Sequence, residues 1–438
     1  MSKKSNILTA QVQSKLSYYF KSFGKQLSAP EVKCIKEMAL GLLKGQTVFI
    51  NKIAGFLSES ISLKKTCKRL SYHYNKAGFW KKVTSDHLHR VSSKIHHGDY
   101  LLMDLSDIQK KYAKMMEGLA FVKDGDGEGT GLGYWLANVV GYNQSGAELI
   151  PLYSKLYSFE KGTKSENQEI IEAIETVRGT IKKAVTWVLD RGADRSILID
   201  HLIEKGTHFI IRLTKKRKLF YNGKEMGVAE ISRKVKLKHY AEVQKVKKNK
   251  VVKKGYHYGA TKVQYKDQHG KLHDMWLTVS KGNNRGYCWL LTNKPYESQA
   301  KAAEETFIGY GHRWKIEEYH RHIKQSYKLE SVQIKTFNGL QSLMAVITVS
   351  MYFIYREIAT LHTKIILEGP IKTMVKNKIR ELRNFIYYKI STLVAELLRG
   401  TTLRNLKPPN PPNPTRQCSI HLFCTMHDPL FQNFIFKS

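Results

Sequence analysis

The segment YGHRWKIEEYHRHIK runs from Tyr310 to Lys324, contains no proline, and has a charge pattern that suits a helix. Residues at helical spacing share one face, because each residue turns the helix by about 100°. One narrow face therefore collects a single carboxylate among other polar side chains: Tyr310, Arg313, Glu317, Arg321, Lys324 and Lys328. One interpretation is a solvated helix laced with ion pairs between residues four apart. The other is that Glu317 holds a metal ion while its cationic neighbours bind phosphates, which requires further carboxylates elsewhere in the chain.

The order and spacing of Tyr310, Arg313, Glu317 and Lys324 are specific. They resemble the Y-R-E-K signature of DDE transposases of the IS-four insertion-sequence family, which are bacterial cut-and-paste enzymes. The preceding stretch CWLLTNKPYES resembles the strand and turn that come before this helix in the family. Two further acidic stretches also match, so the resemblance covers roughly residues 100 to 330.

The first acidic stretch is YLLMDLSDI, residues 100–108. An apolar run that ends in a carboxylate is how a buried strand delivers a charged group to the edge of a sheet. Asp104 is the expected first catalytic acid, because the run LLM leads directly into it. Asp107 competes with Asp104, although strand alternation should send the two side chains to opposite faces.

The second acidic stretch is AVTWVLDRG, in which Asp190 closes another apolar strand. Between the two stretches we expect a hairpin turn in the Gly-rich KDGDGEGTGLG, two more strands, and the helix SENQEIIEAIETVRGTI. Three strands, a helix and a strand form the order of a ribonuclease-H-like sheet, to which the resemblance also points. In that sheet the first and fourth strands are neighbours, so Asp104 and Asp190 should lie close together. Adjacent carboxylates repel unless a divalent cation neutralises them, which indicates a metal site.

The predicted catalytic and metal-binding residues are therefore Asp104, Asp190 and Glu317. We expect them to hold two Mg²⁺ or Mn²⁺ ions, which would polarise a scissile phosphate. The resemblance implies that DNA is contacted by Tyr310, Arg313, Arg321, Lys324 and Trp289. The cations among these would hold the phosphate backbone. Trp289 would stack on a base extruded during hairpin formation, and the alternative is a tryptophan packed in the core of the sheet.

The resemblance implies a cut-and-paste transposase that binds the terminal inverted repeats of its element. It would excise the element by nicking, hairpin formation and hairpin opening, and then join the ends to target DNA. Its partners would be double-stranded DNA and, in the DNA complex, a second copy of the chain. The alternative is an inactive or repurposed transposase-derived DNA-binding protein, against which the presence of all three acids argues. A tyrosine recombinase is disfavoured, since HLHR at His87–Arg90 has no ordered Arg and Tyr partners.

The charge balance favours a polyanionic partner. The 438 residues include 73 Lys and Arg against 37 Asp and Glu, a formal net charge of +36. A field of that sign attracts nucleic acid, and 24 Tyr, 17 Phe and 6 Trp supply rings that can stack on bases. The segment Lys215–Lys254 alone has 15 Lys or Arg against 3 Glu, and alternating β patterns follow it. This basic segment either covers DNA or forms a solvated face.

The predicted fold class is α/β: a ribonuclease-H-like mixed sheet with a β-rich insertion before the final catalytic helix, flanked by helical regions. We expect a helical DNA-end-binding domain at 1–95 and the first part of the catalytic core at 96–213. The basic β-rich insertion at 214–286 then interrupts the core, whose last strand and Glu317 helix follow at 287–334. A helical C-terminal region with a possible dimerisation role at 335–405 and a Pro-rich linker and tail at 406–438 complete the chain. From its residues alone, the N-terminal module could equally serve packing or dimerisation.

We expect no membrane association. The most apolar stretch, LMAVITVSMYFIY at 343–355, is too short for a span and predicts a buried helix. The first residues lack the apolar core of a signal peptide, so we expect a cytoplasmic, nucleoid-associated bacterial protein. Five widely spaced Cys argue against a disulfide framework. The group Cys418, His421, Cys424 and His427 does not have the spacing of a usual zinc finger.

Overall fold

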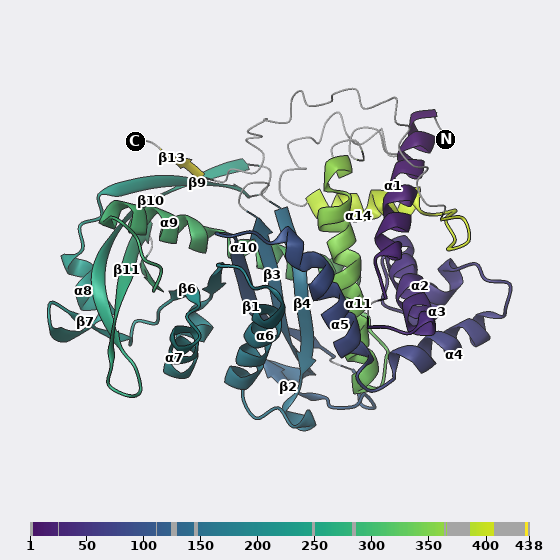
Figure 1. The fold of residues 1–438 in the computed structure, drawn as a ribbon, viewed down its shortest axis with the longest axis horizontal. Helices are drawn as coiled ribbons and strands as arrows, with labels where there is room; N and C mark the ends of the chain where they lie inside the picture. The colour runs from purple at the N-terminus through teal and green to yellow at the C-terminus, as the bar shows by residue number, and fades with distance from the viewer. Residues whose placement is uncertain are drawn as a thin grey trace.

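A long mixed β-sheet runs through the molecule, and helices from both ends of the chain gather at one side of it (Figure 1). The computed structural model describes residues 3–24, 26–110, 112–123, 129–143, 148–247, 250–282, 286–362, 365, 386–406 and 434–436. The centre of the Gly-rich turn, the Pro-rich linker and the Cys and His residues of the tail lie outside these residues. The predicted mixed α/β class with helices at both ends is confirmed.

Residues 3–94 are helical, as predicted. The helices are α1 (Lys3–Lys21), α2 (Ala29–Gly45), α3 (Ile50–Phe56), α4 (Leu63–Tyr74) and α5 (Phe79–Val91), followed by the short η1 (Ser92–Lys94). Apolar residues at helical spacing face inward, since Leu8, Val12 and Leu16 are each at most 1% exposed. The start of α2 is fixed by Ser28, whose backbone N–H donates to Glu31 Oε2 at 2.8 Å.

The centre of the sheet is β1 (Tyr100–Gln109), which pairs antiparallel with β3 (Thr130–Asn143) and parallel with β5 (Thr186–Leu189). The expectation that the first and fourth predicted strands are neighbours is therefore confirmed. Three more strands complete this part: β2 (Ala120–Lys123), β4 (Glu148–Tyr157) and β6 (His208–Arg212). Both β2 and β4 pair with β3, while β6 pairs parallel with β5.

The strand β3 begins inside the Gly-rich stretch, at Thr130, whereas the sequence predicted a turn up to Gly133. The glycine is required by close packing, because a Cβ on Gly133 would lie 2.2 Å from the carbonyl oxygen of Ile108 in β1. Glycine in this strand therefore allows a close backbone approach and does not mark the end of the strand.

Two helices connect the parallel strands, α6 (Glu166–Thr180) and α7 (Ser196–Glu204), together with η2 (Phe159–Lys161) and η3 (Arg191–Ala193). The N-terminus of α6 is capped by Ser165, whose Oγ accepts from the backbone N–H of Gln168 at 3.2 Å. Parallel neighbours need such crossover helices. The predicted helix and the Asp190 strand thus take their expected places.

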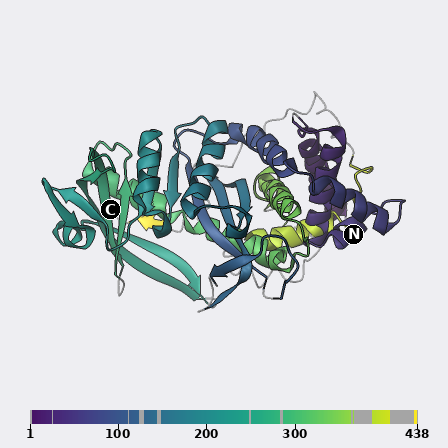
Figure 2. The same ribbon diagram turned by 90° about the horizontal axis from the view of Figure 1, so that it is seen from below.

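The basic insertion extends the same sheet. Its elements are β7 (Lys218–Tyr221), β8 (Lys224–Gly227), α8 (Val228–Lys234), β9 (His239–Lys247), β10 (Lys250–Lys266) and β11 (Leu272–Gly282). The next strand, β12 (Tyr287–Thr292), pairs with β11 on one side and with β6 on the other. The insertion and the central strands therefore share one sheet, and Figure 2 shows the insertion at the opposite end of the molecule from α1. The helix α8 was not predicted, because seven residues are too few to show a helical period.

The C-terminal part adds α9 (Gln299–Gly311), α10 (Trp314–Ser326), η4 (Leu329–Ser331), α11 (Phe337–Tyr352), η5 (Phe353–Glu357), η6 (Ala359–Leu361), α14 (Ile386–Leu397) and β13 (Phe434–Phe436). Among the described residues, one helical stretch, Phe337–Glu357, is long and apolar enough to span a membrane, yet 89% of its most apolar window is buried inside the protein. It is a core helix, as the sequence predicted. Its Gln341 bonds the backbone of Leu156 in β4 through both amide atoms, at 2.9 and 2.6 Å.

Candidate functional site

Two neighbouring parallel strands present Asp104 and Asp190 side by side. The last paired residues of β1 and β5 are Met103 and Leu189, and each acid follows directly. The residues that precede the acids are buried, with Met103 and Leu189 each 2% exposed, while the side chains of Asp104 and Asp190 are 20% and 37% exposed. The apolar runs thus fix both strands in the core and bring the two carboxylates together where the pairing of β1 with β5 stops, while β1 itself continues to Gln109.

The segment 310–324 does not form one helix, which corrects the sequence prediction. Tyr310 lies in the last turn of α9, and α10 begins at Trp314, directly after Arg313. At the junction the backbone N–H of Arg313 donates to the oxygen of Tyr310, and that of Ile316 donates to the oxygen of Arg313. These bonds span three residues instead of four, so the chain is wound more tightly there. Lys328 also falls outside α10, in a left-handed conformation with φ of 53°.

Gly309 sets how closely this junction approaches the sheet. A Cβ on Gly309 would lie 2.7 Å from Ile210 Cδ1 and 2.8 Å from Tyr100 Cε1. We expect Gly309→Ala to lower the free energy of unfolding by about 1 to 3 kcal/mol through overpacking. Urea unfolding measures the effect.

The matched control is Gly179→Ala in α6, where a Cβ meets nothing within 4 Å. This change should leave stability equal or raise it by up to about 1 kcal/mol, because Ala favours a helix over Gly. Equal stability of the two variants would contradict the close packing of α9 on the sheet.

The guanidinium of Arg313 lies among all three predicted acids. Its Nη1 is 3.4 Å from Asp104 Oδ2, its Nε is 3.9 Å from Asp190 Oδ1, and its Nη2 donates to Glu317 Oε1. The Arg313 side chain is 14% exposed, whereas that of Glu317 is 50% exposed. The structure therefore brings Asp104, Asp190 and Glu317 together around one cation. The ion pair expected for a solvated helix, Arg313 with Glu317, is one part of this larger cluster.

The three acids and Arg313 shift one another's protonation. Burial raises the pKa of Asp104 to about 7, and the charges of Asp190 and Glu317 add to this while Arg313 opposes it. Burial would also raise the pKa of Asp190, but Arg313, the backbone N–H of Arg191 and the Tyr310 hydroxyl together lower it below its ordinary value. Despite its own burial, Arg313 has a raised pKa because the acids surround it. Asp190 therefore stays ionised, and Arg313 stays a cation.

Tyr310 and Arg212 contact the cluster from the side of Asp190. The Tyr310 hydroxyl donates to Asp190 Oδ1 at 2.9 Å, and Arg212 Nη1 lies 4.0 Å from the same oxygen. Arg212 is the last residue of β6, the strand beside β5. Sequence reasoning missed Arg212. The signal that could have identified it is its position at the end of the predicted strand that follows the Asp190 strand.

His320 of α10 lies beside Asp104. The Asn138 amide donates to His320 Nε2 at 2.9 Å, so Nδ1 carries the hydrogen and lies 4.0 Å from Asp104 Oδ2. Burial lowers the pKa of His320 to about 3, which keeps the ring neutral. Ser154 in turn donates to the Asn138 carbonyl oxygen. Sequence reasoning missed His320, whose only signal is its place three residues after Glu317.

Asp107 lies apart from the three acids. Its Oδ1 is 3.2 Å from Lys324 Nζ, which also lies 3.7 Å from Glu330 Oε1. Strand alternation was expected to send Asp107 to the face opposite Asp104, but both carboxylates contact side chains of α10. The reason is that Lys324 follows Glu317 by two turns and its long side chain reaches the later part of β1.

Two predicted DNA-binding residues lie outside the cluster. Arg321 is exposed on α10, one turn after Glu317. Trp289 is partly buried in β12 and stacks on Tyr287 at 6.5 Å between ring centroids. Because Leu290 pairs with Arg212 and strand residues alternate, Trp289 lies on the face opposite Arg212. Its indole N–H is buried, with no hydrogen-bond partner among the described residues.

The donor set fits a hard divalent cation, since three carboxylates supply only oxygen ligands. Over the part of the chain that the structure describes, no group of three His, Cys, Asp or Glu side chains is close enough to hold a metal ion. The guanidinium of Arg313 accounts for this spacing, because it occupies the centre of the acids. A metal bound by all three acids therefore requires Arg313 to move away.

Residues 154–353 match the family model described as Transposase DDE domain. The matched range contains Asp190, Arg313 and Glu317, and it begins after Asp104. A comparison with curated proteins gave no match. The family match supports a DDE transposase, a class of enzyme that acts on DNA and generally uses divalent metal ions.

Proposed function

We propose that this protein is a cut-and-paste DDE transposase of the IS-four type, which binds the inverted repeats at the ends of its element, cleaves there and joins the ends to target DNA. The observation that carries the proposal is the convergence of Asp104, Asp190 and Glu317 on Arg313, where the parallel pairing of β1 with β5 stops.

Each residue of the cluster has a chemical role in this proposal. Asp104, Asp190 and Glu317 hold two Mg²⁺ or Mn²⁺ ions. Such ions polarise the scissile phosphate and activate a water or 3′-hydroxyl as the nucleophile. Arg313 neutralises the acids before DNA arrives and then binds the phosphate backbone, with Arg321 and Lys324. Tyr310 holds Asp190 in place and contacts the DNA strand whose backbone Arg313 binds.

DNA of both the element ends and the target is the proposed partner, and two copies of the chain pair the two ends. The formal charge of +36 favours a polyanion over any neutral or basic partner. The helices of residues 3–94 supply end recognition, and the basic insertion covers part of the DNA. The protein acts in the bacterial cytoplasm at the nucleoid.

Cleavage through a DNA hairpin makes a prediction about Trp289. Trp289→Ala should spare the first nick and slow hairpin formation at least about fivefold, the loss expected from removing one base-stacking ring. Denaturing gels of an end-labelled duplex separate the two products. Trp289→Phe, which keeps a ring, should retain most of the rate.

An equal loss of both steps by Trp289→Ala, with a lower unfolding temperature, would assign Trp289 to the core of the sheet. That alternative would rest on its buried indole N–H and its stacking on Tyr287.

A DNA-binding protein without catalysis is the second candidate. It is favoured by the spacing of the acids, which in the described residues do not form a ready metal cluster. In that case Arg313 would be a permanent partner of the acids, and the site would be a structural ion-pair cluster.

The test is cleavage of a labelled duplex that carries the inverted repeat flanking the coding region, in Mg²⁺, Mn²⁺ or EDTA. Nicks and hairpins that require the metal support the transposase. Specific binding without metal-dependent cleavage supports the second candidate.

A further inference from the structure

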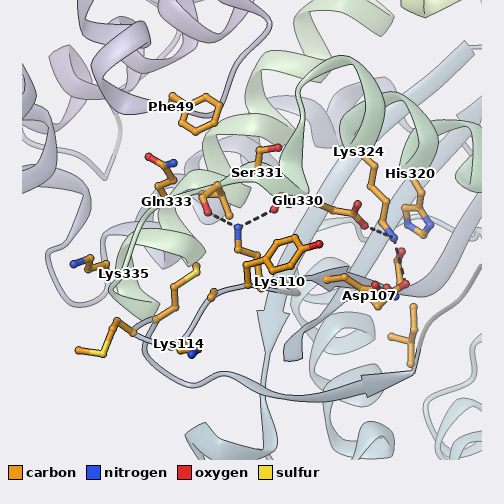
Figure 3. A pocket seen from close by; sticks show the side chains of 18 of the residues that line it. Phe49, Asp107, Lys110, Lys114, His320, Lys324, Glu330, Ser331, Gln333 and Lys335 are labelled. Carbon is orange, nitrogen blue, oxygen red and sulfur yellow. Dashed lines mark hydrogen bonds and ion pairs between the residues drawn. The ribbon is translucent and has the colours of Figure 1, made fainter. Parts of the chain in front are cut away.

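A cavity of about 1350 Å³ opens beside Glu317, on the side away from Trp289. Its walls come from the second half of β1, the loop after β1, α10, the segment 330–335, and Phe49 of the N-terminal helices (Figure 3). In the sheet, β12 with Trp289 and β1 with the cavity lie on opposite sides of β5, which ends directly before Asp190. The acid cluster therefore stands between the two.

Apolar side chains at this cavity are exposed to an unusual degree. Tyr112 is 95% exposed and Met115 is 78% exposed, and both line the cavity. Neither side chain is packed in the core, so both are free to contact a ligand.

The loop that carries Tyr112 and Met115 is fixed at both ends. The buried Lys110 Nζ donates to the carbonyl oxygens of Glu330 and Val332, at 2.8 and 2.5 Å (Figure 3). Its backbone N–H donates to Leu132, and that of Glu117 donates to Lys335. A ring on an anchored loop loses less entropy when it binds a ligand.

The charges around the cavity suit a polyanion. Among the described residues, three acids line it: Asp107 and Glu330 are paired with Lys324, and Glu317 is paired with Arg313. Lys114 and Lys335 are exposed, and neither takes part in an ion pair among the described residues. Two unpaired ammonium groups beside exposed apolar side chains form the combination that binds unstacked nucleic acid.

We propose that this cavity is a second nucleic-acid subsite, which accepts an unpaired base of the DNA next to the scissile phosphate and stacks it on Tyr112. Lys114 and Lys335 bind the phosphates that flank this base. The proposal rests on the DNA-binding part of the proposed function, and it adds a site that is separate from Trp289.

The test compares two fluorescein-labelled duplexes of the same arbitrary sequence, one fully paired and one with a short central bubble of mismatches. Binding is measured by fluorescence anisotropy in EDTA, so that no cleavage occurs. Wild-type protein should bind the bubble DNA at least about fivefold more tightly than the paired duplex. Tyr112→Ala should lose this preference while binding the paired duplex as wild type does, and Tyr112→Phe should keep it.

Tyr388→Ala is the matched control, since Tyr388 is a half-exposed tyrosine of α14 that does not line the cavity. It should behave as wild type. Tyr112 is so exposed that its replacement should leave the unfolding temperature unchanged, which thermal unfolding checks.

The proposal is overturned if wild type shows no preference for the bubble, if Tyr112→Ala keeps the preference, or if Tyr112→Phe loses it as fully as Tyr112→Ala does. It is also overturned if Tyr112→Ala alters the molecular mass in solution and not the DNA preference, since the cavity is then an interface between copies of the chain. Metal-dependent cleavage by wild type with any of these outcomes would leave the proposed transposase intact. If the preference for bubble DNA depends on Tyr112 but wild type shows no metal-dependent cleavage, the subsite proposal stands and the proposed transposase fails.

Discussion

Replacing Asp190 with Asn is expected to reduce metal-dependent DNA cleavage by about a thousandfold or more. The change keeps the shape of the side chain and removes one charged ligand. Loss of several kcal/mol of transition-state stabilisation by the metal corresponds to a rate loss of that size. The rate of cleavage of a labelled element end in Mg²⁺ measures the effect, with Asp104→Asn measured in parallel.

Asp107→Asn is the matched control for this prediction. Asp107 lies on the same strand as Asp104 but pairs with Lys324 and has no contact with Arg313 among the described ion pairs. It should keep cleavage within about tenfold of wild type, since the described contacts of Asp107 do not include the Arg313 guanidinium that the three acids share. Cleavage lost in Asp107→Asn and retained in Asp104→Asn would show that the wrong carboxylate of β1 has been assigned.

Replacing Arg313 with Gln has the second large expected effect, on stability in the absence of metal. Three carboxylates then face one another without their shared cation, and we expect the free energy of unfolding in EDTA to fall by about 1 to 3 kcal/mol. This expected decrease is smaller than the full cost of breaking a buried ion pair, because the Glu317 side chain is 50% exposed to solvent. Urea unfolding in EDTA measures the difference.

Magnesium should act differently on the two proteins. Without Arg313 among the acids, an added divalent ion has no internal competitor, so Mg²⁺ should raise the unfolding temperature more in Arg313→Gln than in wild type. Arg321→Gln, which replaces an exposed arginine of α10, should match wild type in both measurements. Arg313→Gln with wild-type stability in EDTA and the same response to Mg²⁺ would remove Arg313 from its role as counter-ion.

The sequence predicted the positions of Asp104 and Asp190 because the signal for each is local. The run LLM before Asp104 and the run TWVL before Asp190 are apolar enough to be buried strands. Asp190 follows the end of β5, whereas β1 continues past Asp104 to Gln109. Their adjacency came from the expected strand order, and the parallel pairing of β1 with β5 confirmed it.

The break between α9 and α10 could not be read from the sequence. Arg313 has helical dihedral angles, with φ of −53° and ψ of −34°, and only the hydrogen bonding changes from four residues to three. No Pro marks this change. Its consequence is that Tyr310 approaches Asp190 from a different helix than the one that carries Glu317.

The central place of Arg313 was also beyond sequence reasoning. Its pair with Glu317 follows from a spacing of four residues, but its contacts with Asp104 and Asp190 depend on how α10 packs against β1 and β5. The same holds for Tyr112, because nothing local distinguishes an exposed loop tyrosine from a buried one. The ribonuclease-H-like core and the segment boundaries remain predictions.

The most direct test of the central claim is anomalous scattering from Mn²⁺ in crystals of the protein bound to its element end. The account predicts Mn²⁺ bonded to Asp104, Asp190 and Glu317, with the guanidinium of Arg313 no longer among these acids. Arg313 still bridging the three carboxylates at saturating Mn²⁺ and DNA, with no Mn²⁺ beside them, would contradict it.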